Sequence, residues 1–309
     1  MSRAVTLLGP QRRPSVQPVL RDLDPDAPVA TVTAGWQERE SDDAELRELL
    51  GGRAVNLGLH GRWLDLHERD QEYAHAERDH DVALAELRSM YLDRLDHALL
   101  AAYAVGNARE SRPRLSAAAL DDAIEVIRLV DRQHLARVRE VQHAFFAAWR
   151  PQERPVVAQH REEVRGLLGQ AQAVVVAGGH VGELLRVLHL FQVEPHLPDV
   201  VIAWSAGAMA LSERVVLFHD FVPHGVAQTE VLGEGLGVVR GLVPLPHMRR
   251  RLRVDDRIRM SVLARRFAPA RCVVLDDGVR VPLATDGQPP ADARVLDARG
   301  QVTEAGAAA

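Results

Sequence analysis

The feature that most constrains this fold is an apolar run that stops abruptly at a serine. Val200–Trp204 carries no charge, Ser205 follows it, and only small residues and one methionine continue from Ala206 to Ala210. A short apolar run bounded by a turn is typical of a buried strand, and the segment after it has a helical pattern. We therefore expect a strand, a tight turn with Ser205 at its apex, and a helix that begins directly after the turn.

This arrangement has the geometry of a nucleophile elbow, in which a sharp turn between strand and helix exposes a serine hydroxyl. The sequence is close to G-x-S-x-G, with Ala203 at the position of the first glycine. In such an elbow the backbone N–H of Ala206 would face a developing oxyanion, assisted by the helix N-terminus. The alternative is that Ser205 merely caps the helix.

Short apolar strands alternate with helical connections before residue 60 and again after residue 170. Candidate strands lie at residues 4–8, 29–34, 54–59, 173–177 and 272–275. Strands repeated at the spacing of βαβ units predict an α/β fold with a mostly parallel central sheet and helices on its faces.

Between these regions the chain has no strand candidate. Two long apolar stripes with helical spacing occur there, through Leu84, Leu87, Tyr91, Leu95, Ala98 and Ala102, and through Leu120, Ile124, Ile127, Leu135, Val138, Val141 and Phe145. They predict an α-helical insertion at residues 64–150, within an α/β domain formed by residues 1–63 and 151–309. Two helices cover each other only in part, so we expect the hairpin to build a homodimer, or alternatively to form a lid near Ser205.

The composition of the chain limits the classes of function that it can have. The net charge of -5 argues against nucleic-acid binding, and all basic residues other than histidine are arginines, so an arginine alone does not indicate phosphate recognition. Cys272 is the single cysteine and lies in an apolar run. A single cysteine excludes a metal site built from several cysteines, and the glycines at 178–179 lack a nucleotide-binding pattern. The sequence therefore predicts neither a metal site nor a cofactor. With no apolar run of membrane-spanning length, we expect a cytoplasmic protein that does not bind membranes.

Four motifs in this order resemble peptidase family S51, the family of dipeptidase E and cyanophycinase. They are Gly178-Gly179, Trp204-Ser205-Ala206-Gly207-Ala208, the segment from Gly235 to Pro246-His247 with the arginines after it, and Asp276-Asp277. The resemblance covers most of residues 4–60 and 155–300, and the insertion has no counterpart in it. It implies a class I glutamine amidotransferase-like fold, which is a three-layer α/β sandwich.

The resemblance also implies a serine peptidase with a catalytic triad. Ser205 would be the nucleophile and His247 the general base, because a serine hydroxyl attacks well only when an imidazole takes its proton. Asp276 or Asp277 would orient the imidazole. Asp277 matches the second acidic position of the family pair, while the Asp-Asp-Gly sequence is also good turn chemistry.

Four further residues complete the expected site. Gly179 and Ala206 would form the oxyanion hole, and His180 and Trp204 would contact substrate. His180 stands where the family commonly has an amide or an acid. The expected substrate is a small peptide, and the resemblance implies aspartyl peptides. Glutamine amidotransfer is disfavoured because that chemistry uses a cysteine nucleophile on this fold. The remaining alternative is a non-catalytic binding or assembly protein that uses the helical insertion as its interaction surface.

Overall fold

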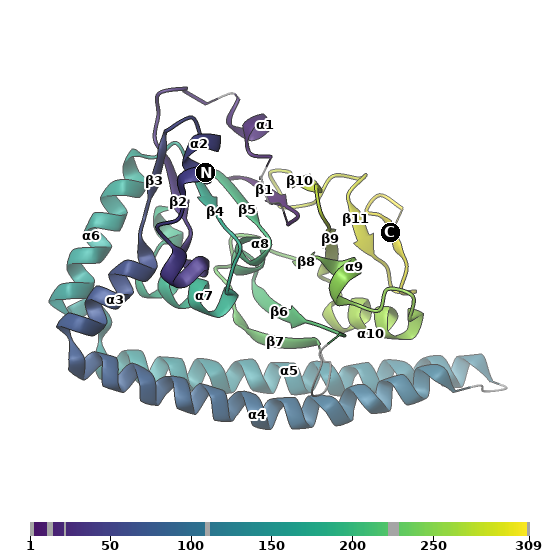
Figure 1. The fold of residues 1–309 in the computed structure, drawn as a ribbon. Coiled ribbons are helices and arrows are strands. Elements are labelled where there is room, and N and C mark those ends of the chain that lie inside the picture. Colours follow the sequence, from purple (N-terminus) through teal and green to yellow (C-terminus); the bar gives the residue numbers. More distant parts are fainter. Residues whose placement is uncertain (1–2, 11–14, 22, 109–111, 222–228, 308–309) are drawn as a thin grey trace.

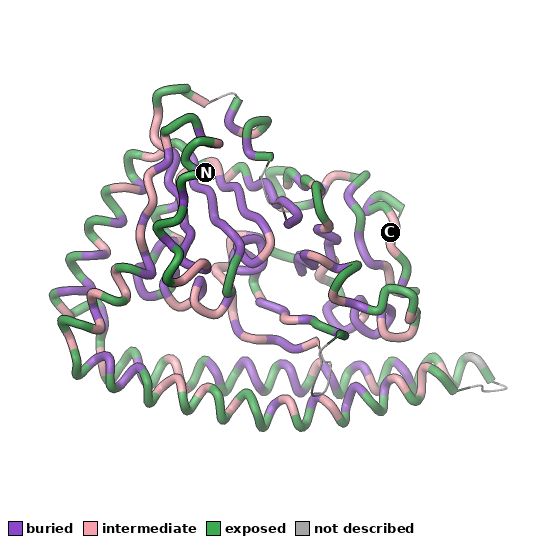
Figure 2. Tube along the Cα trace, in the orientation of Figure 1, coloured by how far each residue is buried: buried purple, intermediate pink, exposed green. Residues whose placement is uncertain are grey.

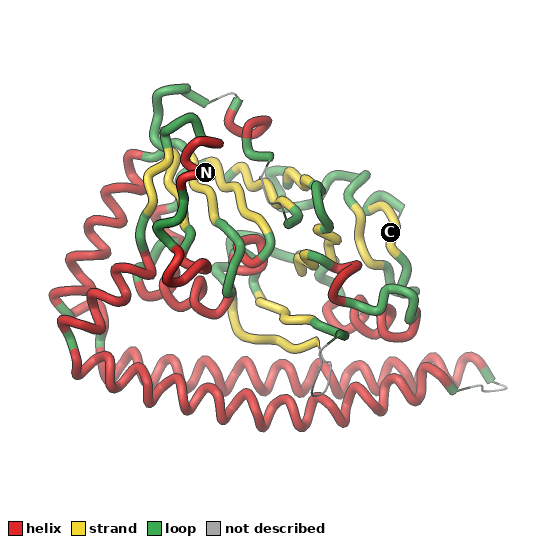
Figure 3. Tube along the Cα trace, viewed as in Figure 1, coloured by secondary structure: helices red, strands yellow, loops and turns green. Residues whose placement is uncertain are grey.

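The computed structural model describes residues 3–10, 15–21, 23–108, 112–221 and 229–307. It confirms the predicted fold class, with a mostly parallel central sheet and a long helical insertion (Figure 1). Figure 3 shows the strands gathered in the body of the molecule, while the insertion that runs along one side of it is helical.

The central sheet has the strand order β10-β1-β5-β4-β2-β3. Its strands are β1 (Ala4–Leu8), β2 (Val29–Val32), β3 (Ala54–Asn56), β4 (Ala173–Val176), β5 (Val200–Trp204) and β10 (Arg280–Pro282). All neighbours pair in parallel except β10, which runs antiparallel to β1 along the edge. The valine-rich strands β4 and β5 lie in the middle and are buried almost throughout, as parallel strands covered on both faces require.

Alternate residues of the strands face two separate apolar layers. Ile202 packs with one cluster and Val201 with the other, so the sheet is the middle of three layers. The first cluster includes residues of α1 (Gln17–Leu20) and α2 (Ala44–Leu49). The second includes residues of α3 (Leu59–Arg69), α6 (Pro155–Gln170), α7 (Val181–Leu190) and α8 (Ala206–Ala210). Short 3-10 turns connect these elements: η1 (Ala34–Arg39), η2 (Pro151–Glu153) and η3 (Glu194–His196).

A second sheet stands beside the first, with the order β12-β11-β9-β8. It consists of β8 (Leu242–Pro246), β9 (Arg271–Leu275), β11 (Arg294–Leu296) and β12 (Val302–Glu304), and α9 (Met248–Arg251) and α10 (Arg257–Phe267) lie between its first two strands in sequence. Strands β8 and β9 are parallel. A separate antiparallel pair is formed by β6 (Arg214–Phe218) and β7 (Thr229–Glu234). The strands that precede His247 and Asp276 therefore belong to a different sheet from the strand that precedes Ser205.

The third predicted strand is shorter than expected. It ends at Asn56, and Leu59 already begins α3, because Gly58 between them has a left-handed backbone that turns the chain. The predicted domain boundary at residue 64 consequently falls inside α3.

The insertion is an antiparallel pair of long helices, α4 (Gln71–Asn107) and α5 (Pro113–Trp149). Most of the predicted stripe is covered within the chain, as the burial colouring in Figure 2 shows. Tyr91 and Leu95 of α4 form one cluster with Ile124 and Ile127 of α5 and with Val262 of α10. The hairpin thus packs on the body of its own chain, and these side chains do not need a second copy to bury them.

A buried ion pair fixes the hairpin to the body. Arg266 of α10 donates through Nε and Nη2 to the two carboxylate oxygens of Asp131 in α5, at 2.7 and 2.6 Å. The Tyr91 hydroxyl donates to the same carboxylate at 2.8 Å, and Arg266 Nη1 donates to the Thr229 carbonyl at 2.6 Å. The side chains of Arg266 and Asp131 are only 1% and 5% exposed. We call Arg266, Asp131 and Tyr91 the hairpin anchor.

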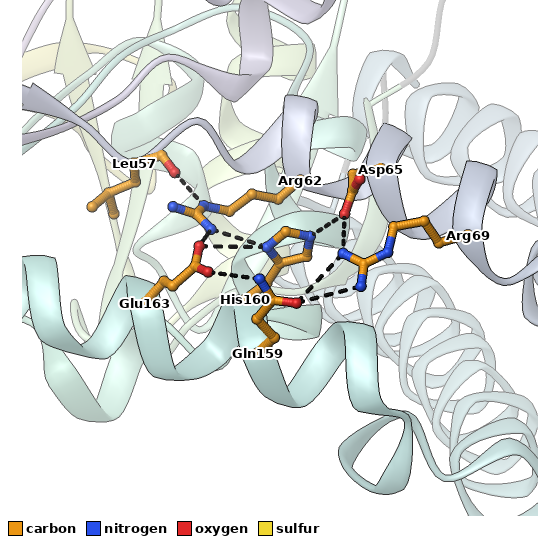
Figure 4. A network of polar contacts seen from close by, with 7 residues as sticks. All are labelled: Leu57, Arg62, Asp65, Arg69, Gln159, His160 and Glu163. Atoms are coloured by element: carbon orange, nitrogen blue, oxygen red, sulfur yellow. Dashed lines mark hydrogen bonds and ion pairs between the residues drawn. The ribbon is translucent and has the colours of Figure 1, made fainter.

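A second polar network joins α3 to α6 where the insertion leaves the body (Figure 4). His160 contacts Arg62 through Nδ1 at 3.0 Å and Asp65 through Nε2 at 2.8 Å. Arginine can only donate, so Nδ1 accepts and the Nε2–H donates to the carboxylate. This bond, helped by Arg69, lowers the pKa of Asp65 below its ordinary value. The network has a structural explanation, because it holds two helices together.

No helix in the described part of the chain is both long and apolar enough to cross a membrane.

Candidate active site

A cavity of about 660 Å³ lies at the carboxyl ends of β4 and β5. Loops from both sheets form its wall, which consists of Pro10, Ser15, Trp36, Gly178, Gly179, Trp204, Ser205, His247, Arg250, Asp277 and Gly278. Ligands of open α/β sheets bind at this edge, where several loops converge. None of these lining residues comes from α4 or α5, so the hairpin does not cover the cavity as a lid.

Ser205 sits at the apex of a strained turn between β5 and α8. Its backbone has φ 52° and ψ -119°, a conformation that costs about 1–3 kcal/mol for a residue other than glycine. The turn is tight because the helix starts against β4. A Cβ atom on Gly207 would lie 2.3 Å from the Val176 carbonyl oxygen, so only glycine fits two positions after the serine. The local geometry is that of a nucleophile elbow.

The Gly178-Gly179 turn lies directly beside Ser205. A Cβ atom on Gly178 would be 3.0 Å from the Cβ of Ser205, and Gly179 has φ +125° and packs against the Gly35 carbonyl. Within the described residues, the backbone N–H groups of Gly179 and Ala206 have no hydrogen-bond acceptor. Two unpaired N–H groups next to a serine hydroxyl are what an oxyanion hole provides.

His247 follows β8 and lines the same cavity. It has a left-handed backbone with φ 57°, and its N–H donates to the Leu275 carbonyl at 3.2 Å, which ties the ends of β8 and β9 together. Burial, followed by the nearby Arg251 guanidinium, lowers the pKa of His247 below the ordinary value of 6.5. The imidazole is therefore largely neutral at pH 7, as a general base must be.

The two adjacent carboxylates after β9 have different surroundings. Asp276 accepts the Arg249 backbone N–H at 3.2 Å and pairs with the Arg249 guanidinium at 3.3 Å. Asp277 lines the cavity, with its Oδ1 3.9 Å from His247 Nδ1. The Oδ2 of Asp277 is 2.5 Å from Arg250 Nη2. Of the pair that the sequence left open, Asp277 is the one that lines the cavity and comes within 4 Å of the imidazole, although 3.9 Å is too long for a hydrogen bond.

The two expected substrate contacts differ in position. Trp204 lines the cavity, although it is only 6% exposed. His180 is not part of the described wall. Its Nδ1 accepts the backbone N–H of Glu183 at 3.1 Å and so caps the first turn of α7. Capping explains a histidine there without a role in binding.

Two wall residues with informative side chains, Trp36 and Arg250, were not predicted from the sequence. Trp36 follows β2, and the next residue, Gln37, has nearly the same strained backbone as Ser205, with φ 57° and ψ -124°. Arg250 lies three positions after His247. The arginines that follow the Pro-His motif were a signal for Arg250. Because arginine is abundant in this chain, the sequence did not show which of them lines the cavity.

Other chemistry-bearing groups lie outside the cavity. Cys272 is buried in β9, and burial raises the pKa of its thiol to about 12, so the thiol stays protonated. Among the described residues, no group of three or more His, Cys, Asp or Glu side chains is arranged to hold a metal ion.

No protein-family model matches this chain, and no curated protein sequence matches it. Among solved structures, it is similar to one described as the crystal structure of a peptidase from an acI-B1 Actinobacterium. The two share 14% sequence identity with a TM-score of 0.41, over 99% of this chain and 96% of that chain. A likeness this distant carries no functional argument, so the function rests on the site itself.

Proposed function

We propose that this chain is a serine hydrolase of the S51 peptidase type that cleaves a small peptide or amide bond. The observation that carries the proposal is the combination of Ser205, His247 and Asp277 around one cavity, with Ser205 on a strained elbow. Strained backbone of this kind clusters at active sites. The alternative of a serine that only caps α8 is disfavoured, because the side chain of Ser205 makes no capping hydrogen bond to the helix.

The proposed reaction follows from the role of each group. Ser205 Oγ attacks the scissile carbonyl carbon while His247 removes the hydroxyl proton. The oxyanion that forms is stabilised by the N–H groups of Gly179 and Ala206. His247 then passes the proton to the leaving amine, and an acyl group remains on Ser205. Water, deprotonated by the same imidazole, releases the acid product.

The cavity wall supports a substrate that carries a negative charge. Arg250 is the cationic side chain among the described lining residues, and it is 71% exposed. A guanidinium in an open cavity suits a carboxylate group. Aspartyl peptides, which the family resemblance implies, fit this description.

A fluorophosphonate probe tests the proposal, because it reacts with activated serines. We expect one adduct, located by mass spectrometry on Ser205 and lost in Ser205→Ala. The His247→Ala variant should slow labelling by about 10²–10⁴-fold, the usual contribution of a general base. Ser15 lines the same cavity and gives a matched control, so Ser15→Ala should be labelled like the wild type. Absence of an adduct, or an adduct on Ser15, would contradict the proposal.

We also propose that the hairpin forms a homodimer, through the side that its own chain leaves uncovered. Leu115, Val126 and Leu129 of α5 are 62%, 51% and 45% exposed. Their spacing of eleven and three residues places them on one face of the helix. Sedimentation velocity would check this, with a Val126→Glu, Leu129→Glu double variant expected to shift a dimer to monomer. A wild-type protein that sediments as a monomer would reject it.

A further inference from the structure

The Asp277 carboxylate lies between two possible partners. Its Oδ2 is 2.5 Å from Arg250 Nη2, whereas its Oδ1 is 3.9 Å from His247 Nδ1. The first distance is that of a strong charge-assisted hydrogen bond, and the second is too long for any hydrogen bond. Arg250 therefore holds the carboxylate that the imidazole needs. We call Arg250 and Asp277 the latch pair.

The neighbouring acid cannot replace Asp277. Both oxygens of Asp276 are engaged by Arg249, one by its backbone N–H and one by its guanidinium. Asp276 is also absent from the described cavity wall. Besides these two carboxylates, the charged groups that act on His247 are the guanidinium groups of Arg251 and Arg250, which cannot accept a hydrogen bond from Nδ1–H. Among the residues that the structure describes, the imidazole therefore has no carboxylate at hydrogen-bond distance.

We propose that Arg250 is a latch that keeps Asp277 away from His247, and that an anionic group of a ligand in the cavity releases it. The inference rests on the proposed function, and it assigns to the site a control step: the substrate itself completes the triad. When a ligand carboxylate pairs with Arg250, Asp277 loses its partner. Its Oδ1 then needs to move by only about 1 Å to accept a hydrogen bond from His247 Nδ1.

Because the latch pair is exposed, separating its two charges costs little free energy. The side chains of Arg250 and Asp277 are 71% and 53% exposed, so neither charge is left buried and unpaired while they separate. Arg250 also belongs to the four-residue helix α9, which begins directly after His247. One turn of helix thus connects Arg250, which would pair with the ligand anion, to His247, the base whose partner Arg250 holds.

The latch predicts how substrates are distinguished. A substrate with an anionic group near Arg250 would assemble the complete triad, whereas a neutral substrate would meet an imidazole without its carboxylate. The difference should appear mainly in kcat, since the missing contact acts on the base during reaction rather than on substrate binding. Arg250 is in this sense a positioning residue for Asp277 as well as a contact for the substrate.

The pKa of His247 shows whether Asp277 is paired with Arg250 or with the imidazole, and its measurement does not require substrate turnover. We would titrate the full-length protein labelled with ¹³C-histidine by NMR, with and without succinate as a dicarboxylate probe at matched ionic strength. His247→Gln assigns the signal. Succinate should raise the pKa of His247 by about one in the wild type, because a carboxylate that hydrogen-bonds to the imidazole favours its charged form.

Three variants separate the latch from simpler explanations. In Arg250→Met, Asp277 is already free, so the pKa of His247 should be raised without succinate and should not respond to it. In Asp277→Asn the response to succinate should be clearly smaller than in the wild type, since only the direct charge of the bound anion remains. Arg249→Met is the matched control on the same helix and should respond like the wild type, because Arg249 holds Asp276 and not Asp277.

The outcomes that would overturn the latch are distinct. The latch is rejected if succinate leaves the wild-type titration unchanged, if Asp277→Asn responds as strongly as the wild type, or if Arg250→Met titrates like the wild type. Failure of the proposed hydrolase would show differently, as an unlabelled Ser205 in the fluorophosphonate experiment, whatever His247 does in the titration.

Discussion

Two arginine–aspartate pairs in this protein have the same chemistry and opposite surroundings. In the hairpin anchor, Arg266 and Asp131 are almost fully buried and are joined by two parallel hydrogen bonds. In the latch pair, Arg250 and Asp277 are more than half exposed and share one short contact. The anchor carboxylate has a further partner in the Tyr91 hydroxyl, whereas the further neighbour of the latch carboxylate, His247, is 3.9 Å away.

The pairing of two residue types therefore does not define their role. A buried pair cannot be opened without leaving an uncompensated charge, and this costs about 3–5 kcal/mol. An exposed pair contributes only about 0–1 kcal/mol to stability, because water solvates both partners when they separate. The first therefore suits a permanent joint between hairpin and body, and the second suits an exchange of partners when a ligand enters the cavity.

Removing one acid from each pair should have the largest and most unequal effects on stability. Asp131→Ala should lower the free energy of unfolding by about 3–5 kcal/mol, because Arg266 remains buried without its counter-charge. Asp277→Ala should change it by less than about 1 kcal/mol. Urea unfolding followed by circular dichroism measures both. Equal effects of the two substitutions would show that burial does not separate the pairs.

A smaller effect of opposite sign is expected at the cavity edge. Ser205→Gly should stabilise the fold by about 1–3 kcal/mol, since glycine adopts φ 52° and ψ -119° without the strain of a side chain. Ser205→Ala keeps the Cβ atom and serves as the control, with little change in stability. If Gly and Ala give the same unfolding midpoint, the elbow stores no strain.

The smallest effect concerns the pH dependence of the cavity. Because burial lowers the pKa of His247, the imidazole stays neutral to lower pH than an ordinary histidine. The rate of fluorophosphonate labelling should therefore rise with pH through a midpoint below 6.5 and then level off. Arg250→Met should move this midpoint upward, since it removes a nearby cation and frees Asp277. A wild-type midpoint above 6.5 would contradict the role of burial.

The sequence allowed most residues of the candidate site to be named, but it did not allow the contacts between them to be predicted. The abrupt end of an apolar run at Ser205 indicated the elbow, and the resemblance of four motifs pointed to His247 and the Asp276-Asp277 pair. The choice between these two acids was not predictable, since both follow the same strand and differ only in which arginine of α9 contacts them. Such a contact depends on where a short helix lies against a neighbouring strand.

The strands, the elbow and the helical hairpin were predictable from the amino-acid sequence, because they follow from local patterns of apolar and small residues. Short valine-rich runs bounded by turns favour buried strands, and stripes of helical period favour helices with a covered face. The tertiary structure alone decided what covers the hairpin and which carboxylate approaches His247. Residues 131 and 266, like residues 205 and 247, are far apart in the chain, and no local pattern encodes the distance between groups that folding brings together.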